Sequence, residues 1–365
     1  MDTIAFIIRR YLNITETFIY EPLRNMKDHK VIVITESAKN LNIFPHSNIC
    51  SLSDSVERGP VFYRNALLQN HIRLIHAHFA WEGIRMTGLK KKLNLPLITG
   101  IYGKDVYEHT KDPFYRWRLR RLFKHGDLFL TFSEKMRERI IRLGCPANKA
   151  VTHHGGADFR KFTFSQRSIS PGQRINLLMV GRFVEKKGFE YGIRAFSEIE
   201  KIHPAAHLNI IGSGAMQEDI ERLIFNLGLG KKISLLGSKN HDDYIKELSN
   251  SHLLIAPSVA AKSGDEEGGI NTVVIEAFAT GLPVVATIHA GSELVFDNKT
   301  GFLAEEANVK DLADKIDRVL SSPELLPKLG QNARKLVESD FDMLKQTGRL
   351  EAIYKELIKS YAKKH

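Results

Sequence analysis

The chain has 365 residues, of which 43% are hydrophobic and 26% charged, and this composition excludes an intrinsically disordered protein. Its two cysteines, Cys50 and Cys145, are too few for a disulfide framework, so we expect reduced thiols in a cytoplasmic protein. No N-terminal signal is visible, and no apolar run reaches the roughly 20 residues of a membrane-spanning helix.

The net charge of +11 is unevenly distributed along the chain. Residues 1–170 contain 28 Lys and Arg against 15 Asp and Glu, whereas residues 171–365 contain 25 against 27. The basic first part predicts an anionic partner, for which a membrane surface, a phosphorylated acceptor and nucleic acid are the candidates. The alternative is a solubilising charge that has no partner.

In chain order, short β-branched apolar runs alternate with amphipathic stretches. Such alternation predicts right-handed βαβ units and a parallel sheet. In the first part we predict strands over 4–8, 31–35, 74–76, 97–101 and 128–131, and helices over 17–27, 61–71, 82–94, 113–125 and 134–143. The polar segment 165–172 ends in Pro-Gly and is predicted to be an interdomain linker.

The pattern then restarts. We predict strands over 175–180, 208–211, 233–236, 253–256 and 284–286, helices near 189–202, 216–227, 241–249 and 272–280, and a helical tail over 308–362. The expected fold is therefore α/β, with two Rossmann-like, doubly wound parallel-sheet lobes facing across a cleft. We expect an N-terminal domain over 1–165, a C-terminal domain over 173–340, and a last helix over 341–365 that packs back on the N-terminal lobe.

The most informative segment is an acidic, glycine-rich loop that leads into a helix. Glu267 lies in the loop, Gly268 and Gly269 follow, the helix begins at Asn271 or Thr272, and Glu276 lies one turn further on. Glycines before a helix leave N–H groups for a phosphate, and carboxylates accept hydrogen bonds from sugar hydroxyls. This pattern suits a nucleotide diphosphate joined to a sugar. The alternative is an ordinary capped helix with acidic residues in its first turn.

A second motif, residues 179–188, is a basic loop directly after a predicted strand. Arg182 and Lys187 can face one diphosphate there, with Arg binding through two parallel hydrogen bonds and Lys acting as a point charge. Lys186 could replace Lys187, and a solvated basic loop is the alternative. Gly212-Ser-Gly214 and Gly237-Ser238 follow two further strands and can approach a ligand through their backbone.

Histidines lie at two other predicted strand ends. His76 and His78 can line a cleft, or be one buried and one surface side chain, and His153 and His154 precede a glycine pair. No spacing typical of metal ligands accompanies the 15 histidines, so we expect no metal.

Together these motifs resemble the family-four retaining glycosyltransferases of GT-B fold, and the resemblance extends over nearly the whole chain. Its most specific stretches are 181–188 and 267–287, while 14–19 (Ile-Thr-Glu-Thr-Phe-Ile) and 76–79 (His-Ala-His-Phe) are similar to the exopolysaccharide and colanic-acid-type subgroup. The resemblance implies a UDP- or GDP-sugar donor, a glycan or lipid-linked acceptor, retention of anomeric configuration, and neither cofactor nor metal.

The resemblance also implies roles for residues. Arg182 and Lys187 are expected at the donor diphosphate, Glu276 at the ribose and Glu267 at the transferred sugar. The expected donor-binding residues are Gly181, Arg182, Lys187, Gly212, Ser238, Glu267, Gly268, Gly269, Ile270, Asn271, Thr272 and Glu276. The expected acceptor-side residues are Thr15, Glu16, His78, Asp105 and His154. The expected catalytic set is Arg182, Lys187, Glu267 and Tyr102.

Two departures from the family pattern matter. The family has seven residues between two glutamates, which places Gly268 rather than Glu267 at the first position. A one-residue insertion reconciles this, and Glu266 is the alternative. Many relatives have His-Gly-x-Asp where this chain has Tyr102-Gly-Lys-Asp105. A phenol can donate and accept a hydrogen bond, but it cannot act as an imidazole does.

The segment 113–124 mixes aromatic residues with basic ones. On a helix, Tyr115, Leu119 and Leu122 share one face, with Phe114 and Phe123 near its edges. Such a helix can lie at an anionic membrane interface on the inner face of the cell membrane, or it can pack on the core with a solvated basic face. No nucleic-acid recognition module is visible, so nucleic acid is not an expected partner.

We therefore expect a retaining glycosyltransferase of surface polysaccharide biosynthesis. The alternatives are a nucleotide-sugar hydrolase or epimerase on the same fold, and a non-catalytic nucleotide-sugar-binding subunit. A nicotinamide dehydrogenase is disfavoured, because position 217, where the dinucleotide fingerprint needs its third glycine, is Gln.

Overall fold

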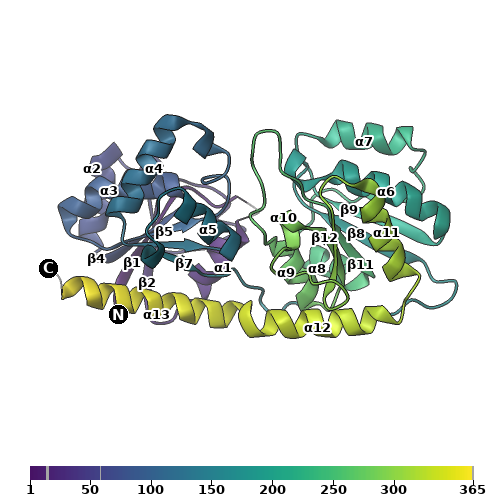
Figure 1. Cartoon of the computed structure of the whole chain (residues 1–365). Helices are drawn as coiled ribbons and strands as arrows, with labels where there is room; N and C mark the ends of the chain where they lie inside the picture. Colours follow the sequence, from purple (N-terminus) through teal and green to yellow (C-terminus); the bar gives the residue numbers. More distant parts are fainter. Residues whose placement is uncertain (14–15, 58, 364–365) are drawn as a thin grey trace. The chain divides into compact units, whose positions relative to one another are not determined.

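The computed structural model describes residues 1–13, 16–57 and 59–363. The chain divides into two compact units, the first comprising Met1–Gly156 and Met343–His365 and the second Ala157–Asp342. Each unit has a parallel β-sheet (Figure 1). A hydrophobic core lies on each face of each sheet. The expected α/β class with two parallel-sheet lobes is therefore confirmed.

The first unit has a seven-stranded sheet in the order β3-β2-β1-β4-β5-β6-β7. Neighbouring strands pair in parallel throughout. The strands are β1 (Thr3–Tyr11), β2 (Lys30–Ala38), β3 (Ile49–Ser51), β4 (Ile72–His78), β5 (Leu97–Ile101), β6 (Leu128–Thr131) and β7 (Ala150–Thr152).

Alternate residues of these strands enter two cores, one on each face of the sheet. Ala5 and Ile7 of β1 pack under α2 (Gly59–Gln69), α3 (Ala80–Leu93), α4 (Pro113–His125) and α5 (Glu134–Arg142). Ile4 and Phe6 pack on the other face, which α1 (Thr17–Asn25) and α13 (Met343–Ala362) cover. Because successive side chains of a strand point to opposite faces, an all-apolar strand is the signature of a sheet covered on both sides.

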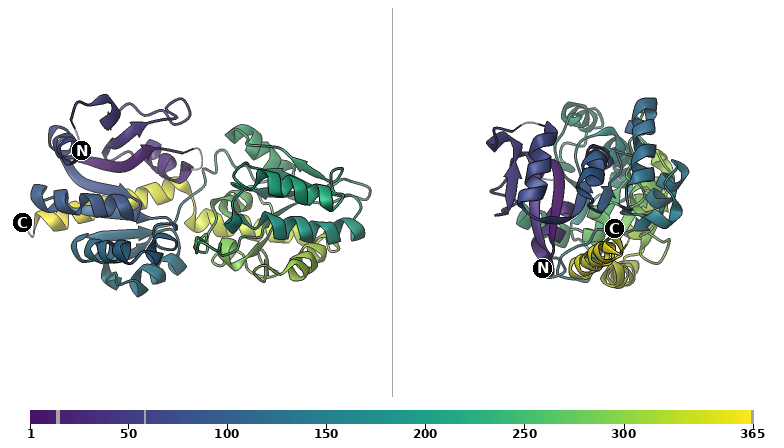
Figure 2. Two further views of the ribbon diagram at one scale, coloured as in Figure 1. Left: turned by 90° about the horizontal axis from the view of Figure 1, so that it is seen from above. Right: turned by 90° about the vertical axis from the view of Figure 1, so that its left-hand side faces the viewer.

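The C-terminal helix α13 is fastened to the first unit by polar contacts as well as apolar ones. The carboxylate of Glu351 accepts hydrogen bonds from the N–H groups of Lys27 (2.9 Å) and Asp28 (2.7 Å). The hydroxyl of Tyr354 lies 2.6 Å from Nδ1 of His76 on β4. Both views of Figure 2 show α13, in yellow, beside the strands of this unit.

The second unit has a six-stranded parallel sheet in the order β10-β9-β8-β11-β12-β13. The strands are β8 (Ile175–Val180), β9 (Ala206–Ile211), β10 (Ile233–Leu235), β11 (Leu253–Ala256), β12 (Val284–Thr287) and β13 (Gly301–Ala304). The helices are α6 (Phe189–Ile202), α7 (Gln217–Asn226), α8 (His241–Asn250), α9 (Thr272–Ala279), α10 (Ile288–Gly291), α11 (Val309–Leu320) and α12 (Leu325–Asp340). Short 3-10 helices span Leu52–Asp54, His109–Lys111 and Ala147–Lys149 in the first unit and Glu185–Lys187 in the second.

In both sheets the strand order reverses beside the first strand of the unit. The reversal lies between β1 and β4 in the first sheet and between β8 and β11 in the second. Ligands of open parallel sheets bind beyond the carboxyl ends of the strands at such a switch point. The loops after these four strands are therefore where the chemistry is to be sought.

The structure differs from the sequence-based expectation at the linker. Residues 165–172 belong to the second unit, which begins at Ala157. Within this segment Arg167 is buried and donates hydrogen bonds to the carbonyl oxygens of Ser165 and Leu248 and to Oγ1 of Thr280. A buried guanidinium needs several acceptors, and the second unit supplies them. Residues 165–172 are therefore part of that unit and not a linker that precedes it.

The sequence predicts neither β3 nor β13, and of β7 it predicts only the end, before His153. Each is three or four residues long and lies at the edge of its sheet. Such strands carry no long apolar run, so hydrophobic periodicity does not reveal them. None of the described helices combines the length and the apolar character needed to cross a lipid bilayer.

Candidate functional site

The loops at the switch point of the second sheet bring basic and acidic side chains together. After β8 the chain turns at Gly181, leaves Arg182 exposed, and buries Phe183, whose N–H donates to the carbonyl oxygen of Ser213 (2.9 Å). Lys187 then folds back, so that its methylene groups lie against Gly181. The two cations predicted to bind a diphosphate thus stand on one short loop.

The acidic loop after β11 pairs with these lysines. The Nζ of Lys187 lies 3.2 Å from Oε2 of Glu267, and the Nζ of Lys186 lies 3.5 Å from Oε1 of Glu267 and 3.1 Å from Oδ2 of Asp265. Burial raises the pKa of Glu267, but the two lysines outweigh it and hold that pKa below its usual value. Burial lowers the pKa of Lys187, and Glu267 partly offsets this.

Glu266, the alternative first carboxylate, is directed elsewhere. Its Oε2 lies 2.8 Å from Nδ1 of His289, at the beginning of α10. Of the two adjacent glutamates, Glu267 is therefore the one that contacts Lys187. Neither Asp265 nor His289 is predicted from the sequence, because their partners are distant along the chain.

Helix α9 begins beside this loop. Asn271 caps it, with its side-chain oxygen 3.3 Å from the N–H of Val273. The N–H groups of Gly269 and Asn271 donate to the carbonyl oxygens of His289 and Ala290, both at 3.0 Å. This corrects the expectation of an open N–H group at Gly269, because that group and the N–H of Asn271 hold the loop against α10. Ile270, the residue between them, is buried in the core.

Glu276, predicted to bind the ribose, lies on α9 as expected. Its Oε2 accepts a hydrogen bond of 2.5 Å from the hydroxyl of Tyr244 on α8. Burial raises the pKa of Tyr244, and the nearby carboxylate raises it further. Glu276 therefore lies beside a neutral phenol that helps to orient it.

The predicted glycine and serine contacts hold the neighbouring strand ends together. Gly212 follows β9 with a φ of +151°, and a Cβ there would lie 1.9 Å from the carbonyl oxygen of Gly181. Its N–H donates to the carbonyl oxygen of Gly237 (3.0 Å), and Oγ of Ser213 lies 2.9 Å from Oγ of Ser238. Only glycine permits this approach of two backbones, so Gly212 has a structural role whatever it binds.

Two of the predicted acceptor-side residues, Glu16 and His78, lie after β1 and at the end of β4, at the switch point of the first sheet. Thr15 lies outside the described residues. The carboxylate of Glu16, at the start of α1, accepts hydrogen bonds from the N–H and Nδ2 of Asn13, both at 2.8 Å. At the end of β4, His76 and His78 are both buried and stacked with ring centroids 4.3 Å apart.

Tyr102 points back into the unit and pairs with His78. Its hydroxyl lies 2.8 Å from Nδ1 of His78, and it covers Gly100, where a Cβ would meet that hydroxyl at 2.3 Å. Burial lowers the pKa of His78 to about 3 and raises the pKa of Tyr102 far above its usual value. Both groups are therefore neutral near pH 7, and the phenol is held by an imidazole.

Asp105, expected on the acceptor side, caps a loop. It is fully buried and accepts hydrogen bonds from the N–H groups of Ala80 (3.0 Å), Tyr102 (3.2 Å) and Gly103 (2.9 Å). Burial raises its pKa to about 6 against the effect of these bonds. The carboxylate thus ties the loop after β5 to the start of α3.

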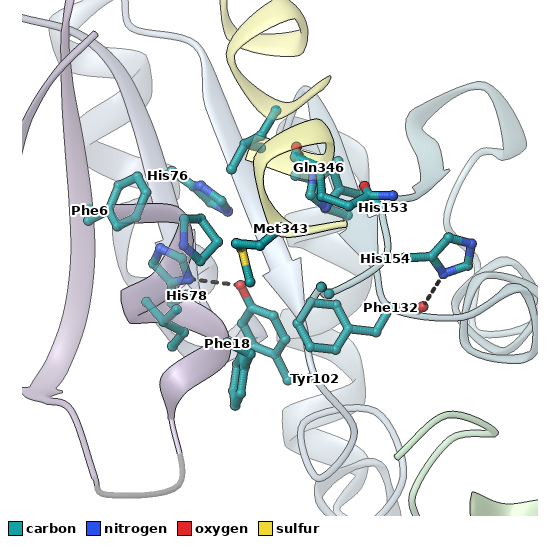
Figure 3. Close-up of a pocket in the computed structure, with 16 residues that line it drawn as sticks. Phe6, Phe18, His76, His78, Tyr102, Phe132, His153, His154, Met343 and Gln346 are labelled. Carbon is teal, nitrogen blue, oxygen red and sulfur yellow. Dashed lines mark hydrogen bonds between the residues drawn. The ribbon is translucent and has the colours of Figure 1, made fainter. Parts of the chain in front are cut away.

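His76, His78 and Tyr102 line a pocket within the first unit (Figure 3). Phe6, Phe18 and Phe132 contribute aromatic walls, and Met343 and Gln346 enter from α13. His154 borders the pocket, with Nδ1 2.8 Å from the carbonyl oxygen of Phe132, and His153 lies 3.1 Å from the carbonyl oxygen of Gln346. The sequence predicts that the last helix packs on this lobe, but not which of its side chains enter the pocket, since almost 200 residues separate α13 from β7.

Groups of three or more metal-ligating side chains are absent from the described part of the chain.

Comparison with known proteins identifies the family. The model of "Glycosyl transferases group 1" matches residues 160–336, and that of "Glycosyltransferase Family 4" matches residues 19–161. WcaL of Escherichia coli K12, a glycosyltransferase named for colanic acid biosynthesis, is 30% identical over 73% of this chain. AmsK of Erwinia amylovora, an amylovoran biosynthesis glycosyltransferase, is also 30% identical over 73% of this chain. The matches cover 66% and 65% of those two proteins, so the chain spans about two thirds of their length.

The fold agrees with this family. The HepE protein of Anabaena, solved in complex with UDP, superposes with a TM-score of 0.82 over 98% of this chain and 100% of HepE, at 16% identity. The expected GT-B fold is therefore confirmed. From the strand order, the two family matches and the sequence relatives together, we conclude that this chain belongs to glycosyltransferase family 4.

Proposed function

We propose that this protein is a retaining glycosyltransferase of exopolysaccharide biosynthesis, which transfers a sugar from a UDP- or GDP-sugar to a hydroxyl of a glycan or lipid-linked acceptor. The observation that carries the proposal is the contact of Glu267 with Lys187 at the switch point of the second sheet, next to the exposed Arg182. The names of WcaL and AmsK support the pathway, and the UDP and UDP-glucose complexes of HepE support the donor class.

The charges of the loop suit a nucleotide-diphosphate sugar. Arg182 and Lys187 can neutralise the diphosphate as it leaves, which is the main electrostatic demand of this reaction. Glu267 then gains a second role, because a carboxylate whose cation turns to phosphate is free to accept hydrogen bonds from the sugar. Glu276, oriented by Tyr244, is proposed to bind the ribose hydroxyls.

In the proposed reaction the bond from the anomeric carbon to the diphosphate oxygen breaks, and a bond to the acceptor oxygen forms on the same face. The acceptor hydroxyl gives its proton to the departing diphosphate, so no side chain has to act as a base. Retention rests on the family resemblance. The neutral Tyr102–His78 pair fits this scheme, because neither group is charged near pH 7.

The acceptor is proposed to bind the first unit near the pocket of Figure 3, with Thr15, Glu16, His78 and His154 on its side. Helix α4 is proposed to hold the protein at the anionic inner face of the cell membrane, where a lipid-linked acceptor would lie. Phe114 and Trp117 are 63% and 52% exposed and stack on each other with centroids 5.8 Å apart, and Arg121 lies over Trp117. Exposed aromatic rings beside arginines are typical of an interfacial helix.

The proposal is tested by thermal unfolding with UDP, GDP, their sugars and NAD, with and without a divalent metal. A ligand at 100 times its dissociation constant adds about 2.7 kcal/mol to the stability of the state that binds it. A rise in midpoint with UDP or GDP ligands, and none with NAD, is the expected result and identifies the base. No rise with any nucleotide would mean that the charged loops are structural, and the proposed donor site would be wrong.

A further inference from the structure

Three consecutive acidic residues in the loop after β11 separate into two directions. Asp265 and Glu267 turn toward Lys186 and Lys187, whereas Glu266, between them, turns toward His289. Because Glu266 has a partner of its own, its carboxylate is held away from the two lysines that contact its neighbours. His289 is that partner.

The imidazole of His289 lies between two carboxylates. Its Nδ1 is 2.8 Å from Oε2 of Glu266, and its Nε2 is 3.0 Å from Oε2 of Glu306. Each ring nitrogen therefore lies within ion-pair distance of a carboxylate from a different segment, one in the loop after β11 and the other just after β13. The His289 ring is only 5% exposed, so solvent screens its contacts with the two carboxylates only weakly.

Glu306 and the segment 289–290 hold the loop after β11 near its two ends. Glu306 accepts a hydrogen bond from the N–H of Ala260 (2.7 Å), near the beginning of the loop. At the far end the carbonyl oxygens of His289 and Ala290 accept the N–H groups of Gly269 and Asn271. The ring and the backbone of one residue, His289, thus bind the loop on either side of Glu267.

We propose that His289 is a positioning residue of the donor site, which holds Glu266 and Glu306 so that Glu267 is presented to Lys187 and the donor sugar. The inference rests on the proposed function, because it assumes that this loop binds the donor. It assigns His289 no contact with substrate. It predicts that the loop loosens when the bridge is removed, while the rest of the second unit stays folded.

The first test measures amide hydrogen exchange in His289→Ala and Glu266→Ala. We expect exchange at residues 260–271 to rise at least tenfold in both variants, with little change in the strands of the sheet. The matched control is His207→Ala, which removes a partly exposed imidazole from the beginning of β9, the strand next to the far edge strand β10 of the same sheet. Unchanged exchange at 260–271 in both variants would overturn the inference.

The second test measures the affinity for UDP and GDP by calorimetry. We expect each single variant to bind the nucleotide that stabilises the unaltered protein about tenfold more weakly. The double variant should bind no more weakly than the weaker single one, because the two residues act through one contact. Wild-type affinity in His289→Ala, or additive losses in the double variant, would overturn the positioning role. If the unaltered protein binds neither nucleotide, the donor site itself is wrong, which this arm reveals without any variant.

Discussion

At the scale of single residues, Lys187 and Arg182 carry the donor assignment. Lys187 is nearly buried and paired with Glu267, whereas Arg182 is exposed on the same loop. A charge-assisted hydrogen bond contributes about 1.5–3 kcal/mol, and tenfold in affinity is about 1.4 kcal/mol.

We therefore expect Arg182→Ala and Lys187→Ala each to weaken the binding of UDP or GDP by about tenfold to a hundredfold, as measured by calorimetry. Lys186→Ala should weaken it less, because Lys186 also pairs with Asp265. Arg174→Ala is the control, because Arg174 is exposed and lies just before β8. This variant should bind UDP or GDP as tightly as the unaltered protein does. Unchanged affinity in both Arg182→Ala and Lys187→Ala would refute the diphosphate assignment.

A second prediction separates the two adjacent glutamates. Glu267→Gln should lower the turnover of a nucleotide sugar, measured as donor hydrolysis or transfer, by about a hundredfold, in line with the loss of one preorganised polar group. Glu266→Gln should keep most activity, because an amide oxygen can still accept a hydrogen bond from His289. The reverse pattern would show that Glu266 is the first motif carboxylate and that the assumed insertion lies elsewhere in the loop.

At the scale of secondary structure elements, α4 divides its side chains between core and surface. Leu119, Leu122 and Phe123 are buried, so Phe123 belongs to the core rather than to the edge of an apolar face. Phe114 and Trp117 remain exposed beside the arginines. The helix therefore packs on the sheet and also presents an aromatic and basic surface, so the two interpretations drawn from its sequence are not exclusive.

The surface of α4 gives a prediction that flotation with vesicles can check. Replacing Arg118, Arg120 and Arg121 by Gln should weaken binding to anionic vesicles by about a hundredfold, at about 1 kcal/mol for each basic residue near the surface. Phe114→Ser with Trp117→Ser should also weaken it. Phe225→Ser, at an 82% exposed aromatic residue of α7 in the second unit, is the control. Equal binding of all variants would exclude α4 as the membrane contact.

At the scale of the whole molecule, buried histidines make stability depend on pH. Burial lowers the pKa of His153 to about 4 and that of His78 to about 3, against 6.5 for an exposed imidazole. Between pH 4 and pH 6.5 these histidines bind more protons in the unfolded chain than in the folded one. Stability therefore has its full value above pH 6.5 and decreases as the pH falls toward 4.

His153→Gln should reduce this dependence. The variant takes up about one proton fewer on unfolding, and one proton corresponds to at most about 1.4 kcal/mol per pH unit between pH 6.5 and 4. Urea unfolding at pH 7 and pH 5 measures the difference, which should be smaller in the variant than in the unaltered protein. His207→Gln, at a partly exposed position, should leave it unchanged, and an equal effect of both variants would contradict the argument.

The sequence by itself determined the class of the fold, most of its elements and the candidate donor loops. Helices 113–125 and 189–202 and strands 97–101 and 175–180 have the predicted bounds, because their apolar patterns and capping residues are local signals. The glycines and charges of 181–188 and 264–276 are likewise contiguous motifs. Elements and motifs that depend only on residues close together in the sequence can therefore be predicted from it.

Only the tertiary structure decided which of these residues meet. The ion pairs of Glu267 with Lys187 and of Glu266 with His289 join segments that are distant along the chain, as does the contact of α13 with His76. The short edge strands β3, β7 and β13 also form only when a neighbouring strand is present to pair with. Burial, which sets the protonation of His78, Tyr102 and Asp105, depends on packing from all sides. These are non-local effects, for which a linear pattern has no signal.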